Sequence, residues 1–166
     1  MAEQTTAAEQ RVTAARRIVV GVDGSSASIE ALHWAARIGA AIGVRIDAVT
    51  VFEYPSSYYG YSATSGAIDA GDDAARSLHD AVAKAYGDAK PDGLRLLVHA
   101  GHSPAKVLLD ASHDAEMLVV GSRGHGGFTG LLLGSVSAAC AEHAACPVVV
   151  VHAGRAPVSA PSPGTP

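Results

Sequence analysis

Residues 121–135 read GSRGHGGFTGLLLGS and join a strand-like run to a helix-like run. The run before them, MLVV at 117–120, is apolar and is typical of a buried strand, whereas VSAACAE at 136–142 is typical of a helix. Glycine allows tight turns with positive φ, so the backbone N–H groups of a glycine-rich loop can converge on a guest. A strand, such a loop and a helix N-terminus predict a site for a polyphosphate.

Two better-known phosphate motifs do not fit these residues. In the P-loop pattern G-x-x-x-x-G-K-[ST], Gly121 and Gly126 are in register, but Gly127 stands where the lysine is required. Without an ammonium group at the β- and γ-phosphates, fast P-loop hydrolysis is not expected. The dinucleotide fingerprint G-x-G-x-x-G would begin at Gly124, and its third glycine is replaced by Thr129.

The pattern that fits is G-x2-G-x9-G-[ST], with Gly121, Gly124, Gly134 and Ser135 in place. In this respect the chain resembles the universal stress protein family, whose ATP-binding members carry the pattern after the fourth strand. Three further segments resemble the family in the expected order. They are RIVVGVDGS at 17–25, GHSPAKVLL at 101–109 and CPVVVV at 146–151.

Strand-like and helix-like runs alternate along the chain. They predict strands at 17–22, 44–52, 94–99, 117–121 and 147–152, and helices at about 25–42, 68–89, 104–113 and 134–144. This alternation predicts an α/β fold with right-handed crossovers. The family resemblance implies an open, Rossmann-like, five-stranded parallel sheet of order 3-2-1-4-5, with helices on both faces. The loops after the first and fourth strands are then expected to line one crevice.

One nucleotide-binding domain is expected over residues 16–152. Residues 1–15 are polar and alanine-rich and predict a flexible arm, and residues 153–166 predict a disordered, proline-rich tail. The longest unpatterned segment, 53–66, contains four tyrosines and is expected to be functional or mobile.

Composition argues against several classes of protein. The formal net charge of -4 provides no basic surface for nucleic acid, and no apolar run approaches the roughly 20 residues that span a bilayer. The first residues lack the basic region and apolar core of a signal peptide, so a cytoplasmic location is expected. In that compartment Cys140 and Cys146 are expected to be reduced, buried thiols.

The adenosine half of the ligand is assigned by resemblance. Gly21 and Asp23 follow the first strand, and Val51 ends the second, where it would lie against adenine. From the residues alone, Asp23 either bonds a ribose hydroxyl or caps the first helix, for which Ser25 and Ser26 are also candidates. Val51 is equally well interpreted as a core residue.

The phosphate half is assigned to the glycine-rich loop and the helix after it. Arg123 and His125 either attract anionic oxygens or point into solvent. The closest histidine pair, His99 and His102, has no second cluster at ligand spacing, so no protein-ligated metal is expected and any Mg²⁺ would arrive with the phosphates. The complete predicted set is Gly21, Asp23, Val51, Gly121, Ser122, Arg123, Gly124, His125, Gly126, Gly127, Gly134, Ser135 and Val136.

No nucleophile, base and acid can be identified together, so binding is favoured over catalysis. The leading hypothesis is a module that binds ATP or another adenine nucleotide in stress response or signalling. The resemblance implies a homodimer formed through the fifth strand. The alternatives are a slow ATPase or phosphotransferase in the same crevice, and a structural dimer that binds no nucleotide.

Overall fold

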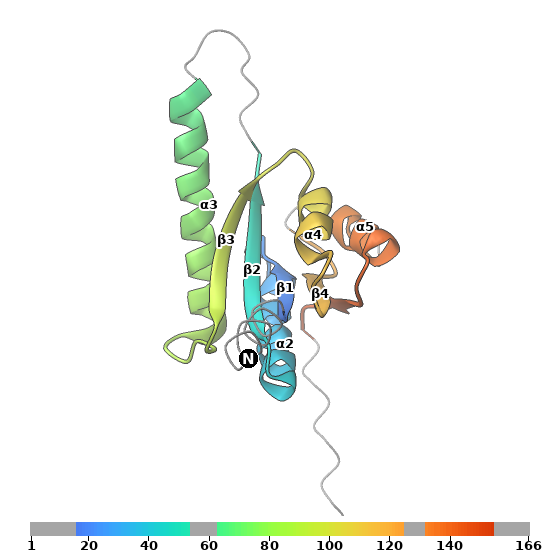
Figure 1. Cartoon of the computed structure of the whole chain (residues 1–166). Coiled ribbons are helices and arrows are strands. Elements are labelled where there is room, and N and C mark those ends of the chain that lie inside the picture. The colour runs from blue at the N-terminus through green and yellow to red at the C-terminus, as the bar shows by residue number, and fades with distance from the viewer. Residues whose placement is uncertain (1–15, 54–62, 125–131, 155–166) are drawn as a thin grey trace, which may run out of the picture.

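The computed structural model describes residues 16–53, 63–124 and 132–154, with the side chains of residues 63–69 excepted. Strands and helices alternate through these residues (Figure 1). The elements are β1 (Arg17–Gly21), α2 (Ser26–Ile42), β2 (Arg45–Phe52), α3 (Ala63–Tyr86), β3 (Leu94–Ala100), α4 (Pro104–Ser112), β4 (Met117–Gly121), α5 (Ser135–His143) and β5 (Val148–Val151).

The strands form one parallel sheet in the order β3-β2-β1-β4-β5. This confirms the predicted α/β fold and strand order. The chain first extends the sheet from β1 to β3 and then returns to add β4 on the other side of β1. The carboxyl ends of β1 and β4 therefore lie side by side at the point where the direction of winding reverses.

Helices cover both faces of the sheet, with α3 on one side and α4 and α5 on the other (Figure 1). Successive side chains of β1 pack on opposite faces of the sheet, because side chains alternate along a strand. Ile18 packs with Leu32 of α2 in one buried cluster, and Val19 packs with Leu108 of α4 and Cys140 of α5 in the other. Burial raises the pKa of the Cys140 thiol to about 11. Cys140 and Cys146 are both free cysteines.

Helix α2 has a defined signal at each end. Ser25 is its N-cap, and the Ser25 side chain accepts a hydrogen bond from the backbone N–H of Ser28. Gly43 follows the last turn with φ at +67°, a conformation that favours glycine at a helix end. The sequence prediction of this helix is confirmed.

The predicted bounds of the helix after β2, at 68–89, were wrong at both ends. Helix α3 begins at Ala63, so residues 63–66 belong to a helix and not to the long loop predicted over 53–66. Their threonine, serine and glycine are weak helix formers, but extending an existing helix costs much less than starting one. At the other end α3 stops at Tyr86, because Gly87 has φ at +55°. Residues 54–62 of the predicted loop lie outside the described part of the chain.

The amino end of the sheet contains a buried carboxylate. Asp47 in β2 is only 4% exposed. Its Oδ2 lies 3.6 Å from Nε of Arg17, and its Oδ1 lies 3.3 Å from Nε of Arg45. These pairs compensate for the desolvation of Asp47 at the edge of the sheet opposite the carboxyl ends.

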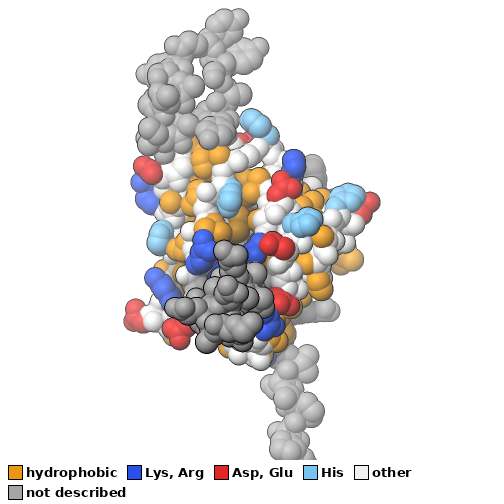
Figure 2. All heavy atoms as spheres, viewed as in Figure 1, with side chains coloured by type: hydrophobic (Ala, Val, Ile, Leu, Met, Phe, Trp, Pro, Cys, Tyr) orange, Lys and Arg blue, Asp and Glu red, His pale blue; other side chains and the backbone are white. Residues whose placement is uncertain are grey.

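The described surface carries both signs of charge. On the face shown in Figure 2, acidic and basic side chains are interspersed, and no patch of one sign dominates among the coloured residues. None of the described helices combines the length and the apolar character that a bilayer span requires.

Candidate functional site

The candidate site begins where β1 and β4 end. The pairing of the strands continues one residue beyond them, because Val22 N donates to Val49 O at 2.8 Å and Ser122 N donates to Val151 O at 2.7 Å. After these bonds the two loops separate, one toward α2 and the other toward α5. The space between them is the switch point at which open α/β sheets bind ligands.

Gly121 brings β4 close to the first turn of α2. A Cβ on Gly121 would lie 2.8 Å from the backbone carbon of Ala27 and 2.9 Å from the backbone nitrogen of Ser28. Position 121 requires glycine, because the backbones of β4 and α2 are in contact there. Neither Gly121 nor Gly124 has a positive φ, so the left-handed conformation is not what requires glycine at these two positions.

Gly124 makes a similar close approach to the loop after β1. A Cβ on Gly124 would overlap Oδ2 of Asp23. The other carboxylate oxygen of Asp23 accepts hydrogen bonds from Ser25, at 3.0 Å from its backbone nitrogen and 2.6 Å from its hydroxyl. Asp23 thus holds the capping residue of α2 and is not itself the N-cap, which corrects the helix-cap alternative.

A single carbonyl fixes the position of α5. The oxygen of Ser122 accepts hydrogen bonds from Gly134 N at 2.7 Å and from the buried hydroxyl of Ser137 at 2.8 Å. The Ser137 hydroxyl also lies 3.0 Å from Gly134 O. These bonds connect the end of β4 directly to the first turn of α5, across the residues that separate them in sequence.

The N-terminus of α5 offers hydrogen-bond donors to the site. Its N-cap, Gly134, has no side chain to cap the helix. The N–H groups of Ser135, Val136 and Ser137 have no acceptor in the part of the chain that the structure describes. They carry the positive end of the helix dipole, so this end of the site favours an anion.

These features surround a cavity of about 510 Å³, which we call the main cavity. Its buried walls are apolar and come from Val49, Leu108 and Val120. Asp23 lines one side, and Arg123 and the first turn of α5 line another. The volume lies within the roughly 300–1,000 Å³ that is usual for small-molecule sites.

Comparison with known proteins identifies the family. Residues 14–152 match the model of the universal stress protein family. The chain belongs to this family. A universal stress protein of Mycolicibacterium smegmatis is 34% identical over 143 residues, which cover 81% of this chain and 47% of the relative. One from Mycobacterium tuberculosis is 36% identical over 153 residues, which cover 92% of this chain and 51% of the relative. The chain thus spans about half the length of these curated relatives.

Solved structures of universal stress proteins share the fold. The structure of UspA from Lactobacillus plantarum aligns with a TM-score of 0.68 and 22% identity over 82% of this chain and 97% of that one. A universal stress protein solved in complex with cAMP aligns with a TM-score of 0.60 and 27% identity over 84% of this chain and 98% of that one.

Most of the predicted site residues of this universal stress protein meet at the main cavity. Ser122 is the exception among the described residues, because its side chain lines a different cavity. His125, Gly126 and Gly127 lie outside the described residues. The predicted residues that line the main cavity are Gly21, Asp23, Val51, Gly121, Arg123, Gly124, Gly134, Ser135 and Val136.

Several residues of the universal stress protein cavity were not predicted from the sequence. Leu108 reaches it from the middle of α4, and Ser28 and Ser137 reach it from the first turns of α2 and α5. Helical periodicity predicted that these residues lie on helices, but it does not indicate which helix packs over the end of which strand. Within the described ranges, no group of three His, Cys, Asp or Glu side chains could hold a metal ion.

Proposed function

We propose that this universal stress protein binds an adenine nucleotide in the main cavity and acts as a nucleotide-dependent module in stress response or signalling. The observation that carries the proposal is the arrangement of this cavity, in which apolar walls, a carboxylate and a helix N-terminus face one space. The proposed ligand is ATP or another adenine nucleotide, with any Mg²⁺ held by its phosphates. The proposed location is the cytoplasm.

Each part of the cavity suits a part of the nucleotide. Val51 and Leu108 supply apolar surface for the adenine ring, and the Asp23 carboxylate can accept hydrogen bonds from ribose hydroxyls. The donors at the N-terminus of α5 and the Arg123 guanidinium suit phosphate oxygens. The related structure in complex with cAMP supports an adenine nucleotide as the ligand class.

Equilibrium dialysis of the full chain against ATP, AMP and cAMP tests the proposal. We expect saturable binding of at least one nucleotide in the micromolar-to-millimolar range. Mass spectrometry of small molecules released from freshly purified protein would identify the nucleotide that the protein carries. The absence of saturable binding for all three nucleotides would contradict the proposal.

The substitution Gly124→Ala tests the position of the nucleotide. Because the added Cβ would overlap Asp23 Oδ2, either Asp23 or the loop must move. We expect the affinity to fall on the order of tenfold or more, since the ribose and phosphate contacts would no longer be aligned. Gly71→Ala in α3 is the matched control, because its Cβ would meet Phe52 at an ordinary 3.5 Å. Equal affinities of the two variants would count against this placement.

A further inference from the structure

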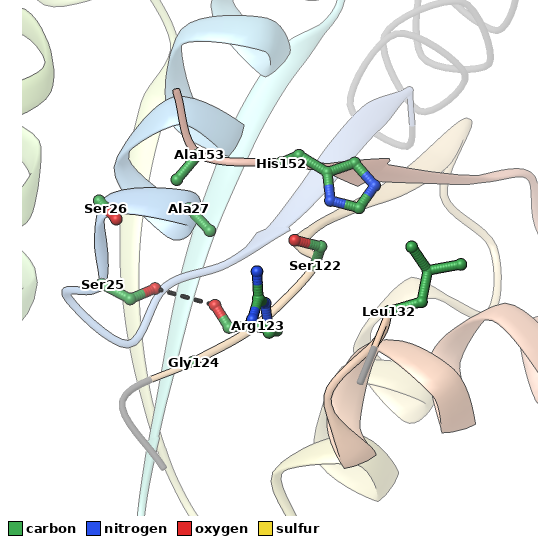
Figure 3. Close-up of a pocket in the computed structure, with 9 residues that line it drawn as sticks. All are labelled: Ser25, Ser26, Ala27, Ser122, Arg123, Gly124, Leu132, His152 and Ala153. Atoms are coloured by element: carbon green, nitrogen blue, oxygen red, sulfur yellow. Dashed lines mark hydrogen bonds between the residues drawn. The ribbon is translucent and has the colours of Figure 1, made fainter. Parts of the chain in front are cut away.

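A second cavity of about 490 Å³ lies beside residues 122–124 (Figure 3). It is bounded by the start of α2, by the residues after β4 and by His152 after β5. Arg123, Gly124 and Ser25 line both cavities, so the segment after β4 is the wall between them. The contacts proposed above for the adenine ring and the ribose lie in the main cavity, not in this one.

The Ser122 side chain points into the second cavity without a partner. Ser122 is only 2% exposed. Its backbone N–H and C=O are bonded to Val151, Gly134 and Ser137, but its hydroxyl makes no hydrogen bond with any part of the chain that the structure describes. Figure 3 shows this hydroxyl turned toward Ala27 and the Arg123 guanidinium. Because no fully buried side-chain N or O atom of the described residues lacks a partner, the Ser122 hydroxyl is open to the cavity, where a ligand atom can complete its hydrogen bonding.

Backbone donors face the same space. Helix α2 has 17 residues and begins at this cavity. Ser25 satisfies the N–H of Ser28, whereas the N–H groups of Ser26 and Ala27 have no acceptor among the described residues. The positive end of the α2 dipole therefore lies at the cavity wall.

The charges around the second cavity favour an anion. The described residues that line it include Arg123 and His152 but no aspartate or glutamate. Asp23, the nearest carboxylate in the preceding loop, bonds Ser25 and lines the main cavity instead. The Arg123 guanidinium forms no ion pair within the described ranges. A guanidinium, an imidazole, a hydroxyl and helix N–H groups together match the acceptors of a tetrahedral oxyanion.

We propose that the second cavity binds a phosphate group, held by the Ser122 hydroxyl, Arg123 and the first turn of α2. The phosphate is either a free anion or the terminal phosphate of a nucleotide whose adenosine occupies the main cavity. A free anion would bind there whether or not a nucleotide occupies the main cavity. Because Arg123 reaches both cavities, a phosphate in the second cavity changes the charge that the nucleotide meets.

The test is an NMR titration of the full, nucleotide-free chain with inorganic phosphate at constant pH. The readout is the imidazole Cε1–H signal of His152, with sodium chloride of equal ionic strength as the reference. His143, which lies on α5 and does not line the cavity, is the internal control. We expect a saturable shift of His152 with phosphate and no comparable shift of His143. Equal shifts of the two histidines would overturn the proposal.

Two variants test whether the Ser122 hydroxyl contacts the phosphate. Ser122→Ala removes a hydrogen bond to a charged ligand, so we expect phosphate affinity to fall about tenfold. Ser77 is an exposed serine on α3, so Ser77→Ala should leave the phosphate affinity unchanged. A far-ultraviolet circular dichroism melt shows whether Ser122→Ala remains folded. A folded Ser122→Ala variant with unchanged phosphate affinity would also overturn the proposal.

The source of the phosphate follows from two further titrations. The site holds the terminal phosphate of the nucleotide if ATP shifts the His152 signal and AMP does not. In that case, adding free phosphate to the ATP complex should cause no further shift of this signal. If phosphate shifts His152 equally with and without AMP, the site holds a free anion. If the protein binds no nucleotide but phosphate still shifts the His152 signal, only the proposed function is contradicted. If the protein binds nucleotide but phosphate does not shift the His152 signal, only this inference is contradicted.

Discussion

At the scale of single residues, two glycines with different surroundings show what glycine does in this chain. Gly121 lies where β4 touches the backbone of α2, and no room exists there for a Cβ. Gly71 lies within α3, and a Cβ there would only contact the ring of Phe52. The absence of a side chain is therefore required at Gly121, whereas at Gly71 it weakens the helix.

The substitution to alanine should consequently have opposite effects at these two positions. Gly121→Ala should lower the free energy of unfolding by roughly 1–3 kcal/mol, because β4 and α2 must separate. Gly71→Ala should raise it by about 0.5–1 kcal/mol, because alanine loses less backbone entropy in a helix. Urea unfolding followed by circular dichroism measures both values. A Gly121→Ala protein as stable as the unchanged chain would show that α2 and β4 are not in backbone contact.

At the scale of elements, the position of α5 determines where the N–H groups of its first turn lie in the main cavity. The N-terminus of α5 is held by Ser122 O, which accepts from both Gly134 N and the Ser137 hydroxyl. The helix is only nine residues long, so such contacts determine its direction more than its own propensity does. Ser137 is therefore a positioning residue for the N–H donors of the first turn of α5.

Removing the Ser137 hydroxyl should weaken nucleotide binding. Ser137→Ala leaves Ser122 O with one donor, and we expect a loss of about 1 kcal/mol in the free energy of unfolding and a several-fold weaker affinity for ATP. Ser112→Ala is the matched control, because Ser112 is equally buried and bonds only Leu109 O within α4. Isothermal titration calorimetry and urea unfolding separate the two effects. If both variants bind ATP equally well, the hydroxyl of Ser137 has no positioning role.

At the scale of the whole molecule, β5 is the end of the sheet next to the site. The carbonyl of Pro147 accepts a hydrogen bond from Leu118 N of β4, and that of Val151 accepts one from Ser122 N just after β4. Because successive residues of a strand direct their backbone groups to alternate sides, those of Val148 and Val150 face away from the sheet. An apolar edge of this kind can pair with a second copy of the chain, as the proposed homodimer requires.

A proline at an outward-facing position should separate the proposed homodimer. Val150→Pro removes an N–H that faces the partner but not one that bonds β4, so we expect a folded monomer. Val149→Pro removes a bond within the sheet and should unfold the chain more readily. Size-exclusion chromatography with light scattering gives the mass, and dialysis gives the affinity for ATP. A Val150→Pro protein that remains dimeric would place the interface elsewhere.

Most of the fold was predictable, because its strands and helices follow from local patterns in the sequence. Apolar runs marked every strand, and Ser25 and Pro104 marked the starts of two helices. The start of α3 was not predictable, because Thr64, Ser65 and Gly66 are weak helix formers on their own. In the site, the spacing of Gly121, Gly124, Gly134 and Ser135 grouped residues that all line the main cavity, and their contact with phosphate stays a prediction.

By itself, the sequence determined the alternation of strands and helices, the glycine spacing and the residues at the strand ends. Those features depend on neighbours along the chain, and a linear pattern records them. Only the tertiary structure decided that Gly121 is glycine because Ala27 touches it, that Ser137 holds Ser122, and that Ser122 faces a second cavity. These contacts join residues from different elements, and no periodicity within one element reports how closely another element approaches.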